Sequence, residues 1–209
     1  MADPQDPPLL VEGPASAPVT FVFAHGAGAP MDTPFQNTIA AGLGAAGVRV
    51  VRFEFPYMAA RRTGGPRRGP DPMPVLEATF RRAVERVGAR GRLAVGGKSM
   101  GGRVATRIAG DVGAERVVVF GFPFHPPGKA TGARLEALST LAVPCLVVQG
   151  TRDRLGNQEE VASYPLPPSV RVEWLPDGDH SFEPRVRSGV TLAANLERAV
   201  ALAAAHLLG

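Results

Sequence analysis

Residues 97–101, Gly-Lys-Ser-Met-Gly, constrain the fold of this chain more than any other segment, because of what lies on either side of them. A short apolar run precedes them at residues 93–96, and a run with helical spacing follows at residues 104–109. This arrangement predicts a sharp strand-to-helix turn at Ser99. Such a turn strains the serine backbone, and side chains two residues before or after it would collide, which explains a glycine at both positions.

From residue 19 onward, the sequence alternates between strand-like and helix-like segments. Continuous Val, Leu and Phe runs are typical of strands that are covered on both faces. Strands are expected at residues 19–24, 48–53, 92–96, 116–121, 144–149 and 170–175. Helices are expected from Pro34 with Asp32 or Thr33 as the cap, from Pro74, after Ser99 as far as Gly110, and around residues 156–163 and 190–207. The alternation predicts an α/β fold: a doubly wound, mostly parallel sheet of about six strands with helices on both faces.

The length of 209 residues fits one domain, expected at residues 18–209. Residues 1–17 read as a flexible, Pro-rich lead-in, in which residues 9–11 are a candidate edge strand. About two dozen residues separate the strands expected at 116–121 and 144–149. A cap domain does not fit there, so we expect a site that is open to solvent.

Three polar residues follow three of the predicted strands directly or within a few residues. Ser99 follows the strand at 92–96, Asp153 the strand at 144–149, and His180 the strand at 170–175. Ligands of parallel α/β sheets bind beyond the carboxyl ends of the strands, where these residues are expected to meet. Ser, Asp and His in this order predict a nucleophile, an orienting carboxylate and a general base.

A second glycine-rich segment, His25-Gly26-Ala27-Gly28, follows the strand at 19–24 at the same edge. Acyl transfer needs N–H donors for the oxygen that becomes negatively charged. We expect the backbone N–H groups of Ala27 and Met100 to form this oxyanion hole.

Further histidine and aromatic side chains flank the predicted site. The candidates for the substrate pocket are His25, Tyr57, Phe124, His125 and Phe182. The aromatic side chains have plain packing as their alternative. For His25 the alternative is a structural role in its loop, and for His125 it is a turn.

The three central residues have alternatives too. Ser99 could cap a helix, or its turn could bind phosphate with help from Lys98. Asp153 could be a solvated loop residue. Asp177 and Asp179 compete for its role, but they lie too close to His180 in the sequence to be its usual partner. Among the other histidines, His206 lies on the expected terminal helix and is predicted to pack or face solvent.

Residues 61–68 contain four arginines and follow the strand at 48–53. Guanidinium groups here could attract an anionic substrate such as a carboxylate or a phosphate ester. A solvated, mobile loop is the interpretation that the composition favours.

Five blocks of the chain carry a family resemblance. They are residues 23–28, 55–58, 97–103, 122–129 and 179–182. Through these blocks the chain, over roughly residues 18–207, resembles the α/β-hydrolases, and within them the small branches without a lid. It is most similar to the KANL/Tex-type hydrolase-like family and more distantly similar to the dienelactone-hydrolase-like group. The resemblance implies the α/β-hydrolase fold and says little about the substrate.

Composition and charge exclude several other classes. The net charge of +4 is small, and basic residues do not alternate with aromatic ones, so no nucleic-acid partner is expected. The single cysteine, Cys145, cannot form an internal disulfide, and no segment resembles a secretion signal or a membrane span, which favours a cytoplasmic protein without membrane contact. Histidine spacing and glycine pattern indicate neither a metal nor a dinucleotide, so no cofactor is expected. The sequence leaves the oligomeric state open.

Together these features predict a serine hydrolase, either a carboxylesterase or a thioesterase. Its partner would be a small-molecule acyl substrate, a soluble ester or thioester, which Ser99, His180 and Asp153 would cleave through an acyl-enzyme. The alternative is a binding or scaffold module with a hydrolase fold and no catalysis. The complete set of Ser, Asp and His favours the enzyme.

Overall fold

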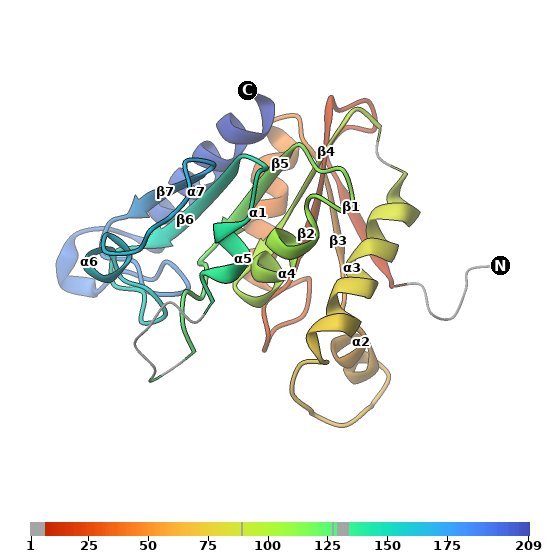
Figure 1. The fold of residues 1–209 in the computed structure, drawn as a ribbon, viewed down its shortest axis with the longest axis horizontal. Helices are drawn as coiled ribbons and strands as arrows, with labels where there is room; N and C mark the ends of the chain where they lie inside the picture. The colour runs from red at the N-terminus through yellow and green to blue at the C-terminus, as the bar shows by residue number, and fades with distance from the viewer. Residues whose placement is uncertain (1–6, 89, 127, 129–133) are drawn as a thin grey trace.

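A seven-stranded sheet with the order β1-β3-β2-β4-β5-β6-β7 forms the centre of the protein (Figure 1). The computed structural model describes residues 7–88, 90–126, 128 and 134–209. Residues 1–6 of the predicted lead-in, and residues 127 and 129 of the block at 122–129, lie outside the described part. The strands are β1 (Leu9–Glu12), β2 (Val19–Ala24), β3 (Arg49–Phe53), β4 (Arg92–Lys98), β5 (Arg116–Phe120), β6 (Cys145–Gly150) and β7 (Val170–Leu175).

Six of the strands are parallel and match the six predicted segments within two residues. The seventh, β1, runs antiparallel to β3 and is the edge strand expected at residues 9–11. The doubly wound α/β prediction is confirmed. Between β5 and β6, the described residues form only a short helix, and no cap domain covers the sheet edge.

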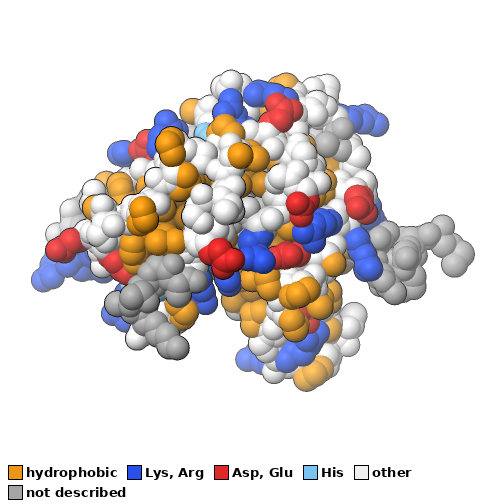
Figure 2. All heavy atoms as spheres, viewed as in Figure 1, with side chains coloured by type: hydrophobic (Ala, Val, Ile, Leu, Met, Phe, Trp, Pro, Cys, Tyr) orange, Lys and Arg blue, Asp and Glu red, His pale blue; other side chains and the backbone are white. Residues whose placement is uncertain are grey.

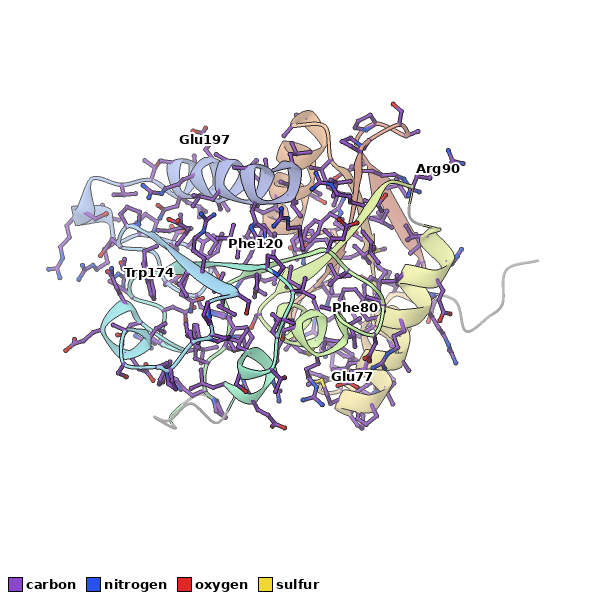
Figure 3. All side chains as sticks on the ribbon, turned by 45° about the horizontal axis from the view of Figure 1, so that its top comes forward. Glu77, Phe80, Arg90, Phe120, Trp174 and Glu197 are labelled. Carbon is purple, nitrogen blue, oxygen red and sulfur yellow. The ribbon has the colours of Figure 1, made fainter. Side chains whose placement is uncertain are left out.

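Helices cover both faces of the sheet. They are α1 (Pro34–Ala45), α2 (Pro56–Arg62), α3 (Met73–Val87), α4 (Met100–Ile108), α5 (Glu136–Ser139), α6 (Gln158–Val161), α7 (Leu192–Leu208) and the 3-10 turn η1 (Val186–Ser188). Figure 3 shows α1 and α7 on one side of the sheet and α3 and α4 on the other. Within the described part of the chain, no helix has both the length and the apolar character to cross a membrane.

The two helices that were predicted to begin at a proline differ in their first residue and in their cap. Pro34 begins α1, and the Thr33 hydroxyl accepts a hydrogen bond from the Gln36 N–H at 3.3 Å, so Thr33 rather than Asp32 is the cap. Helix α3 begins one residue before Pro74 and has no side-chain cap. Helices α2 and α5 were not expected from the sequence, because each is too short to show an apolar period.

Alternate residues of the strands pack into two separate cores. In β2, Phe21 and Phe23 lie in the core under α1 and α7, whereas Val22 and Ala24 lie in the core under α3 and α4. All four are fully buried. A strand that is apolar on both faces can only be stable in the middle of such a three-layer arrangement, which explains the continuous apolar runs of the sequence.

We predict that Leu43→Ala lowers the free energy of unfolding by about 2–5 kcal/mol, because it leaves a cavity where a fully buried α1 side chain packs in the core shared with α7. Val75→Ala on the exposed face of α3 is the control and should change it by less than about 0.5 kcal/mol. Urea denaturation measures both. Equal losses would contradict the described packing of α1.

Candidate active site

The backbone turns sharply at Ser99, between the end of β4 and the start of α4. Ser99 has a φ of 51°, a conformation that is rare for a residue with a side chain. A Cβ atom on Gly97 would lie 2.4 Å from the carbonyl carbon of Gly101, and one on Gly101 would lie 2.5 Å from the His25 oxygen. The collision predicted from the sequence is therefore a real constraint on both glycines.

The Ser99 hydroxyl faces His180. Its oxygen lies 2.8 Å from His180 Nε2, and the side chain makes no capping hydrogen bond to α4. Helix capping therefore does not explain this serine. His180 lies in the segment after β7 and keeps 28% of its side chain exposed, so the pair is accessible.

Asp153 completes the chain of contacts. Its Oδ2 lies 2.7 Å from His180 Nδ1, and the carboxylate is fully buried rather than solvated. A carboxylate at Nδ1 favours the proton on that nitrogen, which leaves Nε2 free to accept the Ser99 proton. The rival Asp177 instead pairs with Arg152 and Arg185, while Asp179 accepts two backbone N–H groups of its own loop.

Two donors hold the Asp153 carboxylate in place. The Leu155 N–H donates to its Oδ1 at 2.8 Å, and the Gln149 side-chain amide donates to its Oδ2 at 2.8 Å. Gln149 is fully buried in β6, and its Oε1 also accepts the N–H of Phe122 at 2.7 Å. Gln149 was not expected from the sequence, although a polar residue in an apolar strand, four positions before Asp153, was the available signal.

Lys98, immediately before the serine, supports the loop of His180. Its ammonium group donates to the His180 carbonyl at 2.5 Å and lies 5.7 Å from the centre of the Phe35 ring. Gly121 leaves the space for this contact: it has a φ of 71°, and a Cβ there would lie 2.8 Å from Lys98 Nζ. Burial lowers the pKa of Lys98 to about 8, although the nearby carboxylates of Asp153 and Asp179 act in the opposite direction.

The segment 25–28 lies beside the serine turn, as expected for an oxyanion hole. A Cβ on Gly26 would lie 3.8 Å from the Ser99 Cβ. Ala27 is exposed at this edge. Met100 is the first residue of α4, where backbone N–H groups lack a partner within the helix.

His25 and Tyr57 hold this segment in shape. His25 Nε2 accepts the Phe55 N–H at 3.1 Å, and its Nδ1 lies 2.7 Å from the Gly26 oxygen. The Tyr57 hydroxyl donates to the Ala27 carbonyl at 2.6 Å. Burial lowers the pKa of His25, which favours the neutral ring that these contacts need. These contacts fit the alternative interpretation of His25, in which the side chain holds its loop and does not contact the substrate.

A cavity of about 510 Å³ opens beside Ser99. It is lined by Gly26, Ala27, Gly28, Ala29, Thr33, Pro34, Phe35, Gln36, Lys98, Ser99, Leu155, His180 and Ser181. The wall thus comes from the segment 25–28, which we call the oxyanion segment after its expected role, from the start of α1 and from the loops that carry Asp153 and His180. Phe35 was not expected there, because in the sequence it reads as part of the apolar face of a helix.

The five predicted pocket side chains are not among the residues that line this cavity. His25, Tyr57, Phe124 and Phe182 are fully buried, and His125 is 6% exposed. Phe124 packs against Phe122 and Tyr164, while Phe182 packs against Phe35. This corrects the expectation that they form the pocket surface: aromatic side chains at the sheet edge gain more from burial than from facing water.

His125 takes part in a turn. Its Nδ1 lies 2.9 Å from the Pro126 oxygen and its Nε2 lies 3.2 Å from the Glu160 carboxylate. It thereby connects the segment after β5 to α6. His125 therefore fits the alternative interpretation, a residue of the turn after β5, better than a residue of the pocket.

The arginine segment 61–68 is mostly exposed, and some of its arginines have carboxylate partners. Arg61 and Arg62 form the last turn of α2. Arg62 donates to both carboxylate oxygens of Glu54 at 2.7 Å and to Asp32 at 2.7 Å, and Arg68 pairs with Asp71 at 2.6 Å. Asp32, Glu54 and Asp71 thus pair with two of the four guanidinium groups, while most of the segment keeps the solvent exposure that the sequence predicts.

Across residues 7–88, 90–126, 128 and 134–209, no group of three or more His, Cys, Asp or Glu side chains is placed to hold a metal ion.

Comparisons with known proteins identify the family and the fold. A family model described as an alpha/beta hydrolase domain matches residues 17–208. No curated protein matches the chain.

Several solved structures share the fold. A serine hydrolase without a lid from Xanthomonas campestris is 22% identical, with a TM-score of 0.70 over 95% of this chain and 93% of its own. A serine hydrolase homologue from Coxiella burnetii is 21% identical, with a TM-score of 0.68 over 93% of this chain and 90% of its own. A dienelactone hydrolase from Anabaena variabilis is 20% identical, with a TM-score of 0.70 over 96% of this chain and 90% of its own. The chain belongs to the alpha/beta hydrolase domain family.

Proposed function

We propose that this protein is a serine hydrolase that cleaves small, soluble esters or thioesters through an acyl-enzyme. The observation that carries the proposal is the contact chain of Ser99, His180 and Asp153, with distances of 2.8 and 2.7 Å. A binding module without catalysis does not need these three side chains in contact. The family membership and the lidless relative support the same reaction class.

The geometry suggests the first half of the reaction. Ser99 Oγ attacks the carbonyl carbon of the substrate while His180 Nε2 takes the hydroxyl proton. The carbonyl oxygen becomes an oxyanion that the N–H groups of Ala27 and Met100 stabilise. The bond to the leaving group then breaks, and His180 gives its proton to the departing alcohol or thiol. Asp153 stabilises the imidazolium throughout and keeps its own charge.

Water completes the cycle. His180 takes a proton from a water molecule, the resulting hydroxide attacks the acyl carbon, and the acid leaves as Ser99 recovers its proton. The open sheet edge supplies the water. A cavity of about 510 Å³ suits a small acyl group.

We predict that Ser99→Ala reduces ester and thioester turnover by a factor of about 10³ or more, because it removes the nucleophile and leaves only the oxyanion donors. The free energy of unfolding should not fall, since the substitution removes no contact in either core. Turnover of a panel of short-chain esters and thioesters measures the effect, with circular dichroism to confirm folding. Ser139→Ala, at an exposed serine of α5, is the control. Wild-type turnover in Ser99→Ala would refute the assignment.

Lys98 gives the protein a characteristic dependence on pH. Its pKa is about 8 when folded, below the ordinary lysine value of 10.5. Between these values the unfolded chain binds more protons than the folded one, so the contribution of Lys98 to stability rises with pH across this window.

We therefore predict that the difference in free energy of unfolding between wild type and Lys98→Met shifts in favour of the wild type from pH 7.5 to pH 9.5. Taking the difference cancels groups that titrate in both proteins, such as the Cys145 thiol, whose pKa burial raises to about 12. Urea denaturation at several pH values measures it. Parallel profiles for the two proteins would show that Lys98 keeps an ordinary pKa.

A further inference from the structure

A second cavity, of about 500 Å³, adjoins the catalytic one. Gly28 of the oxyanion segment lines both cavities. The rest of the second wall includes Met58, Arg61, Arg62, Gly65 and Arg67, which belong to α2 and the segment after it. Figure 2 shows this part of the chain as a lobe that projects from the body and carries basic side chains at its tip.

The two cavities are also connected through side-chain contacts. The Tyr57 hydroxyl donates to the carbonyl of Ala27, the residue proposed to bind the oxyanion. On the same tyrosine, the Arg61 guanidinium carbon lies 5.7 Å from the centre of the ring. One side chain therefore separates Arg61 from the oxyanion segment.

The arginines of this wall are not equally neutralised. Arg62 has two carboxylates, Glu54 and Asp32, as partners. Among the described residues, neither Arg61 nor Arg67 has an ion pair. The cavity thus presents two uncompensated positive charges.

Arg61 also has an unused donor. Its Nη2 donates to the Arg68 carbonyl at 2.5 Å, but its Nε is buried and finds no acceptor within the described part of the chain. Buried polar groups are normally hydrogen-bonded, so Arg61 is not held by a full set of partners from its own chain. The exposed part of its guanidinium group lines the cavity and is what an anion would contact. Guanidinium groups bind carboxylates with good geometry.

We propose that this cavity binds a free carboxylate of the substrate, and that the preferred substrate is therefore a half-ester of a dicarboxylic acid. The inference rests on the proposed function for the ester bond at Ser99 and adds the anion at the far end. The carboxylates of Glu54 and Asp32, which lie behind the wall as partners of Arg62, disfavour a more highly charged group such as a phosphate dianion. A short carbon chain past Gly28 would connect the two sites.

Monoethyl glutarate and ethyl pentanoate test the preference, because they have the same chain length and only the first carries a carboxylate. We expect a lower KM for monoethyl glutarate in the wild type. Arg61→Gln and Arg67→Gln should each raise that KM, Arg61→Gln by about tenfold, and each should raise it more than the KM for ethyl pentanoate. Arg198→Gln, on the exposed side of α7, makes the same charge change away from the site and is the control. Equal effects on both esters, or an equal effect of the control, would overturn the proposal.

Glutarate binding to the wild type, measured by isothermal titration calorimetry, separates this inference from the proposed function. Binding that Arg61→Gln weakens and Arg198→Gln does not would support the anion site even if no ester were cleaved. Absence of glutarate binding would overturn the anion site even if neutral esters were cleaved.

Discussion

The active site depends on one strained turn of the backbone. At Ser99 a φ of 51° lifts the hydroxyl out of the sheet edge, and the strain is tolerated because the surrounding elements leave no alternative path. The Ser99 N–H donates to the Phe120 carbonyl of the neighbouring strand at 3.1 Å, and the Arg103 N–H returns to the Ser99 carbonyl at 3.0 Å. Ser99, the proposed nucleophile, is therefore held by β5 and α4 rather than by its own loop.

The parallel sheet brings the other groups to this turn. Strands β4, β6 and β7 end at the same edge, so residues separated by 27 and 81 positions in the sequence come within hydrogen-bond distance. A second layer of contacts then fixes each one: Gln149 holds Asp153, Lys98 holds the His180 loop, and Tyr57 holds the oxyanion segment. Orientation of the reacting groups in this way is what catalysis by a serine requires.

Much of this arrangement could be predicted from the sequence, for physical reasons. Continuous apolar runs identified the buried strands, because burial on both faces leaves a local pattern in the sequence. The contacts among Ser99, Asp153 and His180 could be expected because each residue follows a parallel strand, and such strands end at one edge of the sheet. The pocket wall was predicted less well. Phe124 and Phe182 are buried instead of lining it, and the arginines at 61–68 are partly fixed by Glu54 and Asp32. The burial of the aromatic side chains and the ion pairs of the arginines depend on contacts between residues from different segments. The spacing of residues along the sequence does not predict such contacts.

The central claim is that His180 activates Ser99, and covalent labelling tests it without knowledge of the substrate. A fluorophosphonate probe reacts with activated serines, and peptide mass spectrometry locates the adduct. The account predicts one adduct, on Ser99, that His180→Ala greatly reduces. A folded protein that stays unlabelled, or one labelled equally well without His180, would contradict it and favour a binding module built on the same fold.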